Sequence, residues 1–156
     1  MPKILFVCSA NMCRSPMAQV LFERLLRQHG IQDEWEVGSA ATWGFDGSRA
    51  TEGAIQAMKR KGLDLSMHRS RNITRELVRD NDLILTMERN HKEALRIEVP
   101  EYAAKIMLLS EIVSQNYEIR DPVGGLASDY DATADELESL LVEGFDWILS
   151  QVEARP

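Results

Sequence analysis

The chain has 156 residues, which suits one folded domain, and its composition of 44% hydrophobic and 28% charged residues is typical of globular proteins. No apolar stretch approaches the ~20 residues that a membrane span requires, and the N-terminus lacks the basic and apolar regions of a secretory signal. We therefore expect a cytoplasmic protein that does not bind membranes. The net charge of −7 argues weakly against nucleic acid as a partner.

The first elements along the chain are a buried strand and a helix. Residues 3–7 include four consecutive apolar side chains, which favours a strand covered on both faces. Ser15 followed by Pro16 predicts a helix start, with a capping hydroxyl and a proline at the first helical position. Gly30 is the expected stop. Residues 8–14 therefore form a strand-to-helix loop.

The remaining elements continue this alternation. We expect further strands at residues 35–39, 82–87 and 105–109, and further helices at residues 51–61, 75–78 (capped by Thr74) and 88–97. Residues 114–132 are expected to form a long polar loop, and a capping box at Thr133 predicts the start of the last helix. The pattern predicts an α/β fold over residues 1–156. We expect a single domain with a four-stranded parallel sheet, strand order 2-1-3-4 and helices on both faces.

Charge is distributed unevenly along the chain. Basic residues gather in the middle, at Lys59, Arg60, Lys61, Arg69, Arg71, Arg75 and Arg79, and acidic residues near the end, at Asp129, Asp131, Asp135, Glu136, Glu138, Glu143 and Asp146. The simplest interpretation is solvated helix faces of opposite sign, and the alternative is a docking surface for a charged partner.

The strand-to-helix loop carries the pattern of an oxyanion site. A loop before a helix N-terminus can direct several backbone N–H groups at one anion, and Asn11 tolerates the left-handed conformation that such a loop often needs. Arg14 offers a planar fork for two phosphate oxygens, and Cys8 is the candidate nucleophile. The other expected phosphate-binding residues are Ser9, Ala10, Met12, Cys13 and Ser15.

The nucleophile must react as a thiolate. A helix N-terminus stabilises a nearby anion by only about 0.3–1 kcal/mol, whereas lowering the pKa of a free thiol from ~8.5 to ~5 requires roughly 5 kcal/mol. We therefore expect Arg14, the Ser15 hydroxyl and the loop N–H groups to supply most of the stabilisation of the Cys8 thiolate.

Residues 7–16, Val-Cys-Ser-Ala-Asn-Met-Cys-Arg-Ser-Pro, resemble the signature V-C-x-G-N-x-C-R-S-P of the low-molecular-weight protein tyrosine phosphatases. The resemblance extends through the chain, to residues 39–42, to residues 68–71 and to the Asp-Pro pair at 121–122. One departure is Ala10, where the family usually has glycine. If that position needs a positive φ, alanine costs about 1 kcal/mol.

The resemblance implies a role for each matching residue. Cys8 would attack phosphorus, Arg14 would hold the phosphate, and Ser15 would bind the thiolate and ease its departure. Asp121 would be the general acid that protonates the leaving oxygen, and later the base that activates water. Pro122 restricts Asp121 to an extended backbone, which helps to fix the carboxylate.

Three further residues would support the loop. The resemblance implies that Asn11 keeps the loop in shape through a network with Ser39 and His68. It also implies that Cys13 can trap an oxidised Cys8 as a reversible disulfide, before oxidation proceeds to sulfinic acid.

The rim residues give conflicting indications of the substrate. Phosphotyrosine-specific relatives usually carry aromatic residues after the Asp-Pro pair, but here Val123 and two glycines follow, as in the bacterial subgroup that includes protein arginine phosphatases. In that subgroup a small threonine in the loop is associated with phosphoarginine, whereas Met12 resembles the phosphotyrosine type. Trp43 is a candidate aromatic wall. We expect a phosphotyrosine protein phosphatase, with protein arginine phosphatase as the alternative.

The expected partners are a phosphorylated protein and, in the loop, inorganic phosphate or another oxyanion. We expect no metal or cofactor, because Arg14 and the loop supply the positive charge. Arsenate reductases share this fold but relay oxidation through two cysteines outside the loop, and this chain has only Cys8 and Cys13. A non-catalytic phosphopeptide-binding module would be expected to lose Cys8, Arg14 or Asp121, and all three are present.

Overall fold

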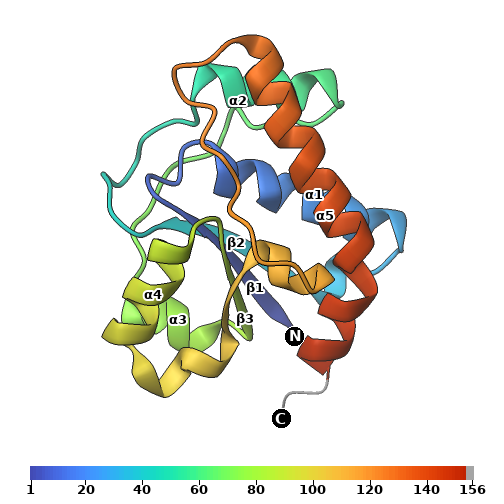
Figure 1. Cartoon of the computed structure of the whole chain (residues 1–156). Coiled ribbons are helices and arrows are strands. Elements are labelled where there is room, and N and C mark those ends of the chain that lie inside the picture. The colour runs from blue at the N-terminus through green and yellow to red at the C-terminus, as the bar shows by residue number, and fades with distance from the viewer. Residues whose placement is uncertain (154–156) are drawn as a thin grey trace.

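The computed structural model describes residues 1–153, which contain a four-stranded parallel sheet with the order β2-β1-β3-β4 (Figure 1). The strands are β1 (Lys3–Cys8), β2 (Glu36–Ala41), β3 (Leu83–Thr86) and β4 (Ile106–Leu108). In the register of the central strand, Val7 lies opposite Ala40 of β2 and Thr86 of β3. The predicted parallel sheet and its strand order are confirmed.

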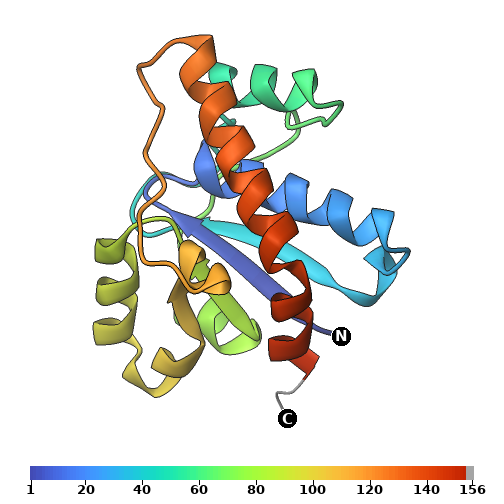
Figure 2. The same ribbon diagram turned by 45° about the vertical axis from the view of Figure 1, so that its right-hand side comes forward.

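Helices cover both faces of the sheet, as predicted (Figures 1 and 2). One face carries α1 (Arg14–Gln28), α2 (Glu52–Arg60) and α5 (Ala127–Glu153), and the other carries α3 (Arg75–Asp80) and α4 (Arg89–Glu98). Short 3-10 helices are η1 (Gln32–Glu34), η2 (Pro100–Lys105) and η3 (Leu109–Val113). Within residues 1–153, none of the helices combines the length and the apolar character that crossing a membrane requires.

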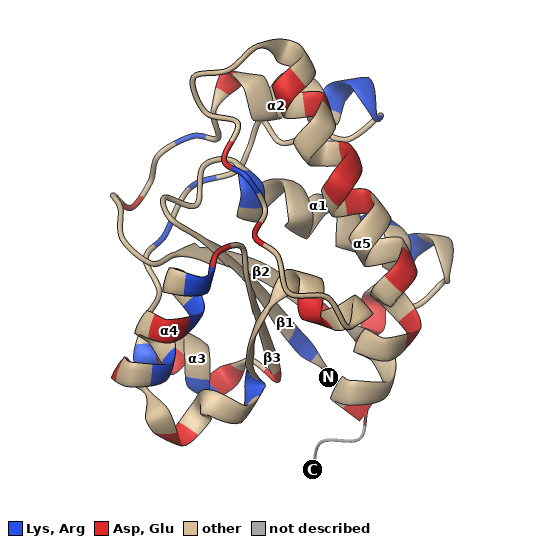
Figure 3. Cartoon of the chain, viewed as in Figure 1, with Lys and Arg blue, Asp and Glu red and all other residues tan. Residues whose placement is uncertain are grey.

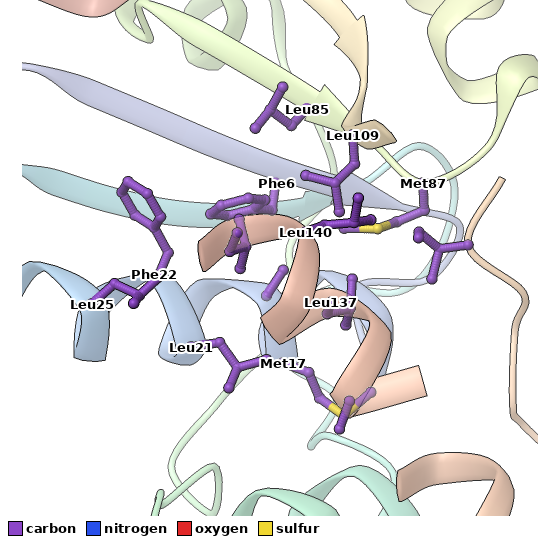
Figure 4. Packing of buried hydrophobic residues seen from close by; sticks show 14 of the residues in the cluster. Phe6, Met17, Leu21, Phe22, Leu25, Leu85, Met87, Leu109, Leu137 and Leu140 are labelled. Atoms are coloured by element: carbon purple, nitrogen blue, oxygen red, sulfur yellow. The ribbon is translucent and has the colours of Figure 1, made fainter. Parts of the chain in front are cut away.

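The central strand divides the core into two parts. Because side chains alternate along a strand, Ile4 and Phe6 face α1 and α5, whereas Leu5 and Val7 face α3 and α4. On the first face, the ring of Phe22 lies 5.9 Å from that of Phe6, and Figure 4 shows them beside leucines of α1 and α5. This packing anchors α1 against the sheet, so that its N-terminus lies beside the end of β1.

The last helix begins earlier than predicted. It starts at Ala127, so the capping box expected at Thr133 is wrong, and the Thr133 hydroxyl instead donates to the carbonyl of Asp129 at 3.1 Å within the helix. The Asp129 carboxylate accepts the N–H of Leu126 at 2.7 Å, just before the helix. Tyr130, in the first turn, is buried in the core. Burial of Tyr130 favours a helix that starts at Ala127, before the start that the local pattern indicated.

Two predicted helix ends agree with the structure, the cap of α3 and the stop after α1. Thr74 caps α3 through its hydroxyl, which accepts the N–H of Leu77 at 3.1 Å. Gly30 and Gly62 follow α1 and α2 with φ of 69° and 79°, a conformation that glycine adopts without strain.

The opposite charges of the middle and the end of the chain partly neutralise each other across α2 and α5. Arg60 lies 2.7 Å from Asp131, and Lys61 lies 2.7 Å from Asp135 and 3.0 Å from Glu138. Figure 3 shows the acidic residues along the exposed side of α5. Surface pairs of this kind contribute only about 0–1 kcal/mol each. These lysine and arginine side chains are therefore partners of α5, which favours the simpler interpretation of the charge pattern.

Candidate active site

The candidate site lies where β1 ends and α1 begins. Cys8 is the last residue of β1 and Arg14 the first of α1, so residues 9–13 form the connecting loop. The C-terminal end of β3 lies beside it, because Val7 pairs with Thr86. This edge is where parallel α/β sheets bind their ligands.

The loop turns its carbonyl groups outward. The N–H of Trp43 donates to the carbonyl of Ser9 at 3.1 Å, and the N–H of Thr51 donates to the carbonyl of Met12 at 2.8 Å. Within residues 1–153, no backbone hydrogen bond takes up the N–H groups of residues 9–13. Several adjacent N–H donors at a helix N-terminus form a concave anion-binding site.

Asn11 fixes the shape of the loop. It is fully buried and adopts the predicted left-handed conformation, with φ of 58°. Its side-chain amide donates to the Ser15 hydroxyl at 2.8 Å and accepts the N–H of Arg71 at 3.0 Å. Its carbonyl accepts a hydrogen bond from Nε2 of His68 at 2.7 Å. The expected contact between Asn11 and His68 is therefore present, and burial lowers the pKa of His68.

Ser39 reaches this network only indirectly. Its hydroxyl donates to Gln19 at 2.7 Å rather than to Asn11. Its carbonyl accepts a hydrogen bond from Nε of Arg71 at 3.0 Å, and the Arg71 N–H in turn binds Asn11. The sequence provided no sign that Arg71 would join the two residues.

The candidate nucleophile contacts a serine. Sγ of Cys8 lies 3.0 Å from the hydroxyl of Ser15 and accepts the Ser15 N–H at 3.4 Å. Because the Ser15 oxygen already accepts from Asn11, its own proton is available to the sulfur. The predicted capping role of Ser15 is wrong, since α1 has Cys13 at its N-cap position without a side-chain cap. The Ser15 hydroxyl instead forms a hydrogen bond with Sγ of Cys8.

Arg14 joins three separate segments of the chain. It is 2% exposed, and its Nη1 donates to the carbonyl of Ile119 at 2.7 Å and pairs with the Glu88 carboxylate, also at 2.7 Å. Nη2 lies 3.7 Å from the Asp121 carboxylate and 3.5 Å from the Ser9 hydroxyl. Glu88 was missed by sequence reasoning, although an acidic residue directly after a strand at this sheet edge was a usable signal.

Asp121 lies at the mouth of the site. Its side chain is 47% exposed, and one carboxylate oxygen accepts the N–H of Val123 at 3.1 Å, which orients the group. A cavity of about 390 Å³ lies beside it, lined by residues 120–125 and the start of α5. The candidate acid is thus near the arginine, and open to solvent on the other side.

The expected rim residues are only partly buried or exposed. Met12 is half-buried, whereas Trp43 is 82% and Val123 55% exposed. Phe45, which sequence reasoning missed, is 81% exposed, two residues beyond Trp43. The segment that carries both rings is joined to the loop by the hydrogen bond from Trp43 to Ser9.

Ala10 causes no backbone strain. Among residues 1–153, the non-glycine residues with positive φ are Asn11 and Ser114, so Ala10 adopts an ordinary conformation. The cost of about 1 kcal/mol that a left-handed alanine would carry does not arise.

The two cysteines differ in their surroundings. Cys13 is buried, and burial raises the pKa of its thiol to about 12, partly offset by a hydrogen bond with Thr51. The Cys13 thiol is therefore protonated at neutral pH, and its reaction with an oxidised Cys8 stays a prediction. Cys8, in contrast, lies beside a hydroxyl donor and a backbone N–H.

Comparisons with known proteins relate this chain to known phosphatases. Residues 3–153 match the family model described as low molecular weight phosphotyrosine protein phosphatase. The chain is 37% identical to the protein-arginine-phosphatase of Bacillus subtilis, over 88% of this chain and 91% of that protein. It is also 37% identical to the human low molecular weight phosphotyrosine protein phosphatase, over 82% of this chain and 84% of that protein.

A solved structure of the arginine phosphatase YwlE extends the likeness to three dimensions. It is 34% identical to this chain, covers 95% of both chains and has a TM-score of 0.88. That structure is of a mutant in which the active-site serine is phosphorylated.

Proposed function

The chain belongs to the low molecular weight phosphotyrosine protein phosphatase family and is a phosphatase, and we propose that it hydrolyses phosphotyrosine in proteins through a phosphocysteine intermediate. The observation that carries this proposal is the contact of Cys8 with Ser15 at 3.0 Å, below an arginine that also approaches Asp121. These contacts support the proposal, because they bring the candidate nucleophile, anion clamp and proton donor to one end of the sheet.

In the first step, the thiolate of Cys8 attacks phosphorus, and the bond between phosphorus and the tyrosyl oxygen breaks. The N–H groups of the loop and the Arg14 guanidinium bind the non-reacting phosphate oxygens, whose charge is stabilised in the transition state. Asp121 donates its proton to the departing oxygen, which leaves as a neutral phenol.

In the second step, water attacks the phosphocysteine. Asp121, now a carboxylate, accepts a proton from the water, and the bond between phosphorus and Sγ of Cys8 breaks. The Ser15 hydroxyl donates a hydrogen bond to the departing thiolate, for which it is already placed. Glu88 keeps the Arg14 fork oriented through both steps. The products are inorganic phosphate and free enzyme.

Phosphotyrosine is favoured by the aromatic side chains at the rim. Trp43 and Phe45 are more than four-fifths exposed on a segment tied to the loop, where they can pack against an aromatic ring. The apolar side chain of Met12 lies in the loop itself and adds to the same surface.

Phosphoarginine is the second candidate substrate. Val123 and the glycines after it give no aromatic wall beside Asp121, and a relative of equal identity is a protein-arginine-phosphatase. In that reaction, the same cysteine would attack phosphorus while the bond to the guanidinium nitrogen breaks.

The first experiment tests the nucleophile. Cys8→Ser is expected to abolish hydrolysis of p-nitrophenyl phosphate, whereas Cys13→Ser, a matched change of the other cysteine, is expected to retain it. Rapid acid quench of the wild-type enzyme with a phosphorus-labelled substrate should trap label on Cys8. Turnover by Cys8→Ser at the wild-type rate would contradict the proposed mechanism.

The second experiment identifies the substrate. We would measure kcat/KM on two peptides that differ only in a phosphotyrosine or a phosphoarginine at one position. We expect the phosphotyrosine peptide to be preferred, and a preference above tenfold for phosphoarginine would overturn this assignment.

A further inference from the structure

A buried histidine lies behind the loop. His91 belongs to the first turn of α4 and is 2% exposed. Its ring makes two hydrogen bonds, one to the backbone of Glu88 at 3.2 Å and one to the hydroxyl of Ser9 at 2.9 Å. Neither the chemical steps described above nor the sequence pattern assigns a role to this imidazole.

The first contact fixes the direction of the second. Nδ1 of His91 accepts the N–H of Glu88, so the proton of a neutral ring resides on Nε2. Nε2 then donates to the oxygen of Ser9. Nε2 of His91 thus donates a hydrogen bond to the hydroxyl of Ser9, the residue directly after the candidate nucleophile.

The same turn of α4 also holds the arginine. Glu88 is the N-cap residue of this helix, and its backbone N–H is the group that donates to the His91 ring. The Glu88 carboxylate pairs with Arg14 at 2.7 Å. One helix start therefore contacts both ends of the loop, at Ser9 and at Arg14.

Charged groups from several segments face the His91 ring. Burial lowers the pKa of the ring, and the nearby charge of Arg14 lowers it further. The carboxylates of Glu88, 3.8 Å from Nε2, and of Glu118 have the opposite effect and raise the pKa. The balance favours the neutral imidazole at neutral pH. That is the only form in which Nδ1 can accept the N–H of Glu88.

We propose that His91 is a positioning residue of this phosphatase, which as a neutral imidazole holds Ser9 and the start of the phosphate-binding loop in the geometry that binds the anion. This inference rests on the proposed function. It assigns to His91, a residue outside the loop, the role of keeping the phosphate-binding loop in place. Protonation of the ring adds a proton at Nδ1, so that the N–H of the ring and the N–H of Glu88, two donors, face each other. The contact with the capping turn is then lost, and the hold on the loop weakens in acid.

Two substitutions separate the contacts of the ring. His91→Asn places a polar atom near Nδ1 and keeps the capping contact, but it does not reach Ser9. His91→Gln reaches the position of Nε2, keeps a donor for Ser9 and does not titrate. Ser9→Ala removes the other partner, and the double variant His91→Asn/Ser9→Ala tests whether His91 acts through Ser9.

We would measure kcat and KM on p-nitrophenyl phosphate, and the Kd of inorganic phosphate, from pH 5 to pH 8. His91→Asn and Ser9→Ala are each expected to lower kcat/KM roughly threefold to tenfold, the range expected for one lost hydrogen bond. The double variant should lose no more of its kcat/KM than either single variant does. His91→Gln should recover most of the loss at pH 7. Because burial lowers the pKa of His91, the ratio of wild-type to His91→Gln activity should stay constant down to the usual histidine pKa of ~6.5 and decrease in more acidic solution.

Two results would overturn the inference. One is a His91→Asn loss that persists in full when Ser9 is alanine, and the other is a ratio of wild-type to His91→Gln activity that stays constant with pH. Thermal unfolding identifies a variant that fails to fold, in which case Ser9→Ala and the pH profile of His91→Gln decide the question. If the wild-type protein binds phosphate but hydrolyses nothing, the proposed function fails, while the phosphate affinities still report on His91.

Discussion

The floor and the rim of the phosphate site are built differently. On the floor, Asn11, Arg14 and Ser15 are at most 2% exposed, and each polar side chain is hydrogen-bonded to other parts of the chain. On the rim, Trp43 is 82% and Val123 55% exposed. Buried polar groups are costly unless they are paired, so a change on the floor disturbs several partners at once. A change on the rim disturbs few.

This difference separates the reaction from the choice of substrate. In the proposed mechanism, the floor binds the phosphate group, which phosphotyrosine and phosphoarginine have in common, and the rim contacts the rest of the phosphorylated side chain. Relatives with either activity can therefore share one floor, and a 37% identity to both kinds of enzyme is consistent with that. Substitutions on the floor and on the rim should therefore have different effects.

The largest effect is expected at Asp121, which lies between the two regions. Asp121→Asn removes the proposed proton donor and should lower kcat about 10²–10⁴-fold on an alkyl phosphate, whose leaving group needs protonation. The effect on an activated aryl phosphate should be smaller. Because the side chain is 47% exposed, thermal unfolding should change little. A loss below threefold on both substrates would exclude the role of general acid.

The next effect tests the floor. Asn11→Ala removes the hydrogen bonds of the buried amide to Ser15 and Arg71 and places alanine at a positive φ. We expect the free energy of unfolding to fall by about 1–3 kcal/mol, the cost of leaving buried polar groups unpaired. Since the loop loses its shape, kcat/KM should fall about tenfold or more.

Urea unfolding and kinetics of the same preparation measure both quantities for Asn11→Ala. Asn90→Ala, a change at an exposed asparagine of α4, is the matched control and should alter neither. Loss of stability with unchanged kcat/KM would show that the buried amide supports the fold but not the chemistry.

The sequence predicted the floor better than its supports. The loop, the left-handed Asn11 and its contact with His68 follow from local chemistry and from one recognisable motif. The partners of Arg14 do not, because Glu88 and Ile119 come from distant parts of the chain and meet it only in the folded sheet. Local patterns carry no information about which distant carbonyl or carboxylate will face a buried arginine.

The same reason explains the errors at helix starts. Ser15 and Thr133 both have the local pattern of a cap, but tertiary contacts use them otherwise. The Ser15 hydroxyl binds Cys8 and Asn11, and burial of Tyr130 draws the start of α5 to Ala127. Strand order and helix layers were predictable because alternating strands and helices allow few topologies.

A smaller effect is expected on the rim. Trp43→Ala removes an exposed ring, so it should lower kcat/KM on a phosphotyrosine peptide by roughly threefold to tenfold, within the range for one aromatic contact. The value of kcat/KM on a phosphoarginine peptide should change by less than twofold. The melting temperature should change by less than a few degrees.

Met12→Thr tests the rim from the loop side. Replacing the half-buried methionine by a small polar residue is expected to shift the ratio of kcat/KM towards phosphoarginine, while p-nitrophenyl phosphate is still hydrolysed. An equal loss on both peptides would mean that Met12 belongs to the floor, and that the two regions are not separable at this position.

The smallest effect is a pH dependence of stability that originates on the floor. Burial lowers the pKa of His68, whose Nε2 binds the carbonyl of Asn11. Between the usual histidine pKa of ~6.5 and the lower value in the fold, the unfolded chain binds a proton that the folded chain does not. Stability is therefore intact above about pH 6.5 and decreases as the pH falls below it.

His68→Gln isolates this contribution, because glutamine can donate to the carbonyl of Asn11 but does not titrate. Urea unfolding at pH 7.5, 6.5 and 5.5 should show the wild-type protein losing more stability in acid than the variant does. The Trp43→Ala variant should follow the wild-type curve, since the rim contains no titrating partner of this histidine. Parallel curves for wild type and His68→Gln would mean that the floor tolerates a charged imidazole, and that its polar groups are less tightly constrained than their burial indicates.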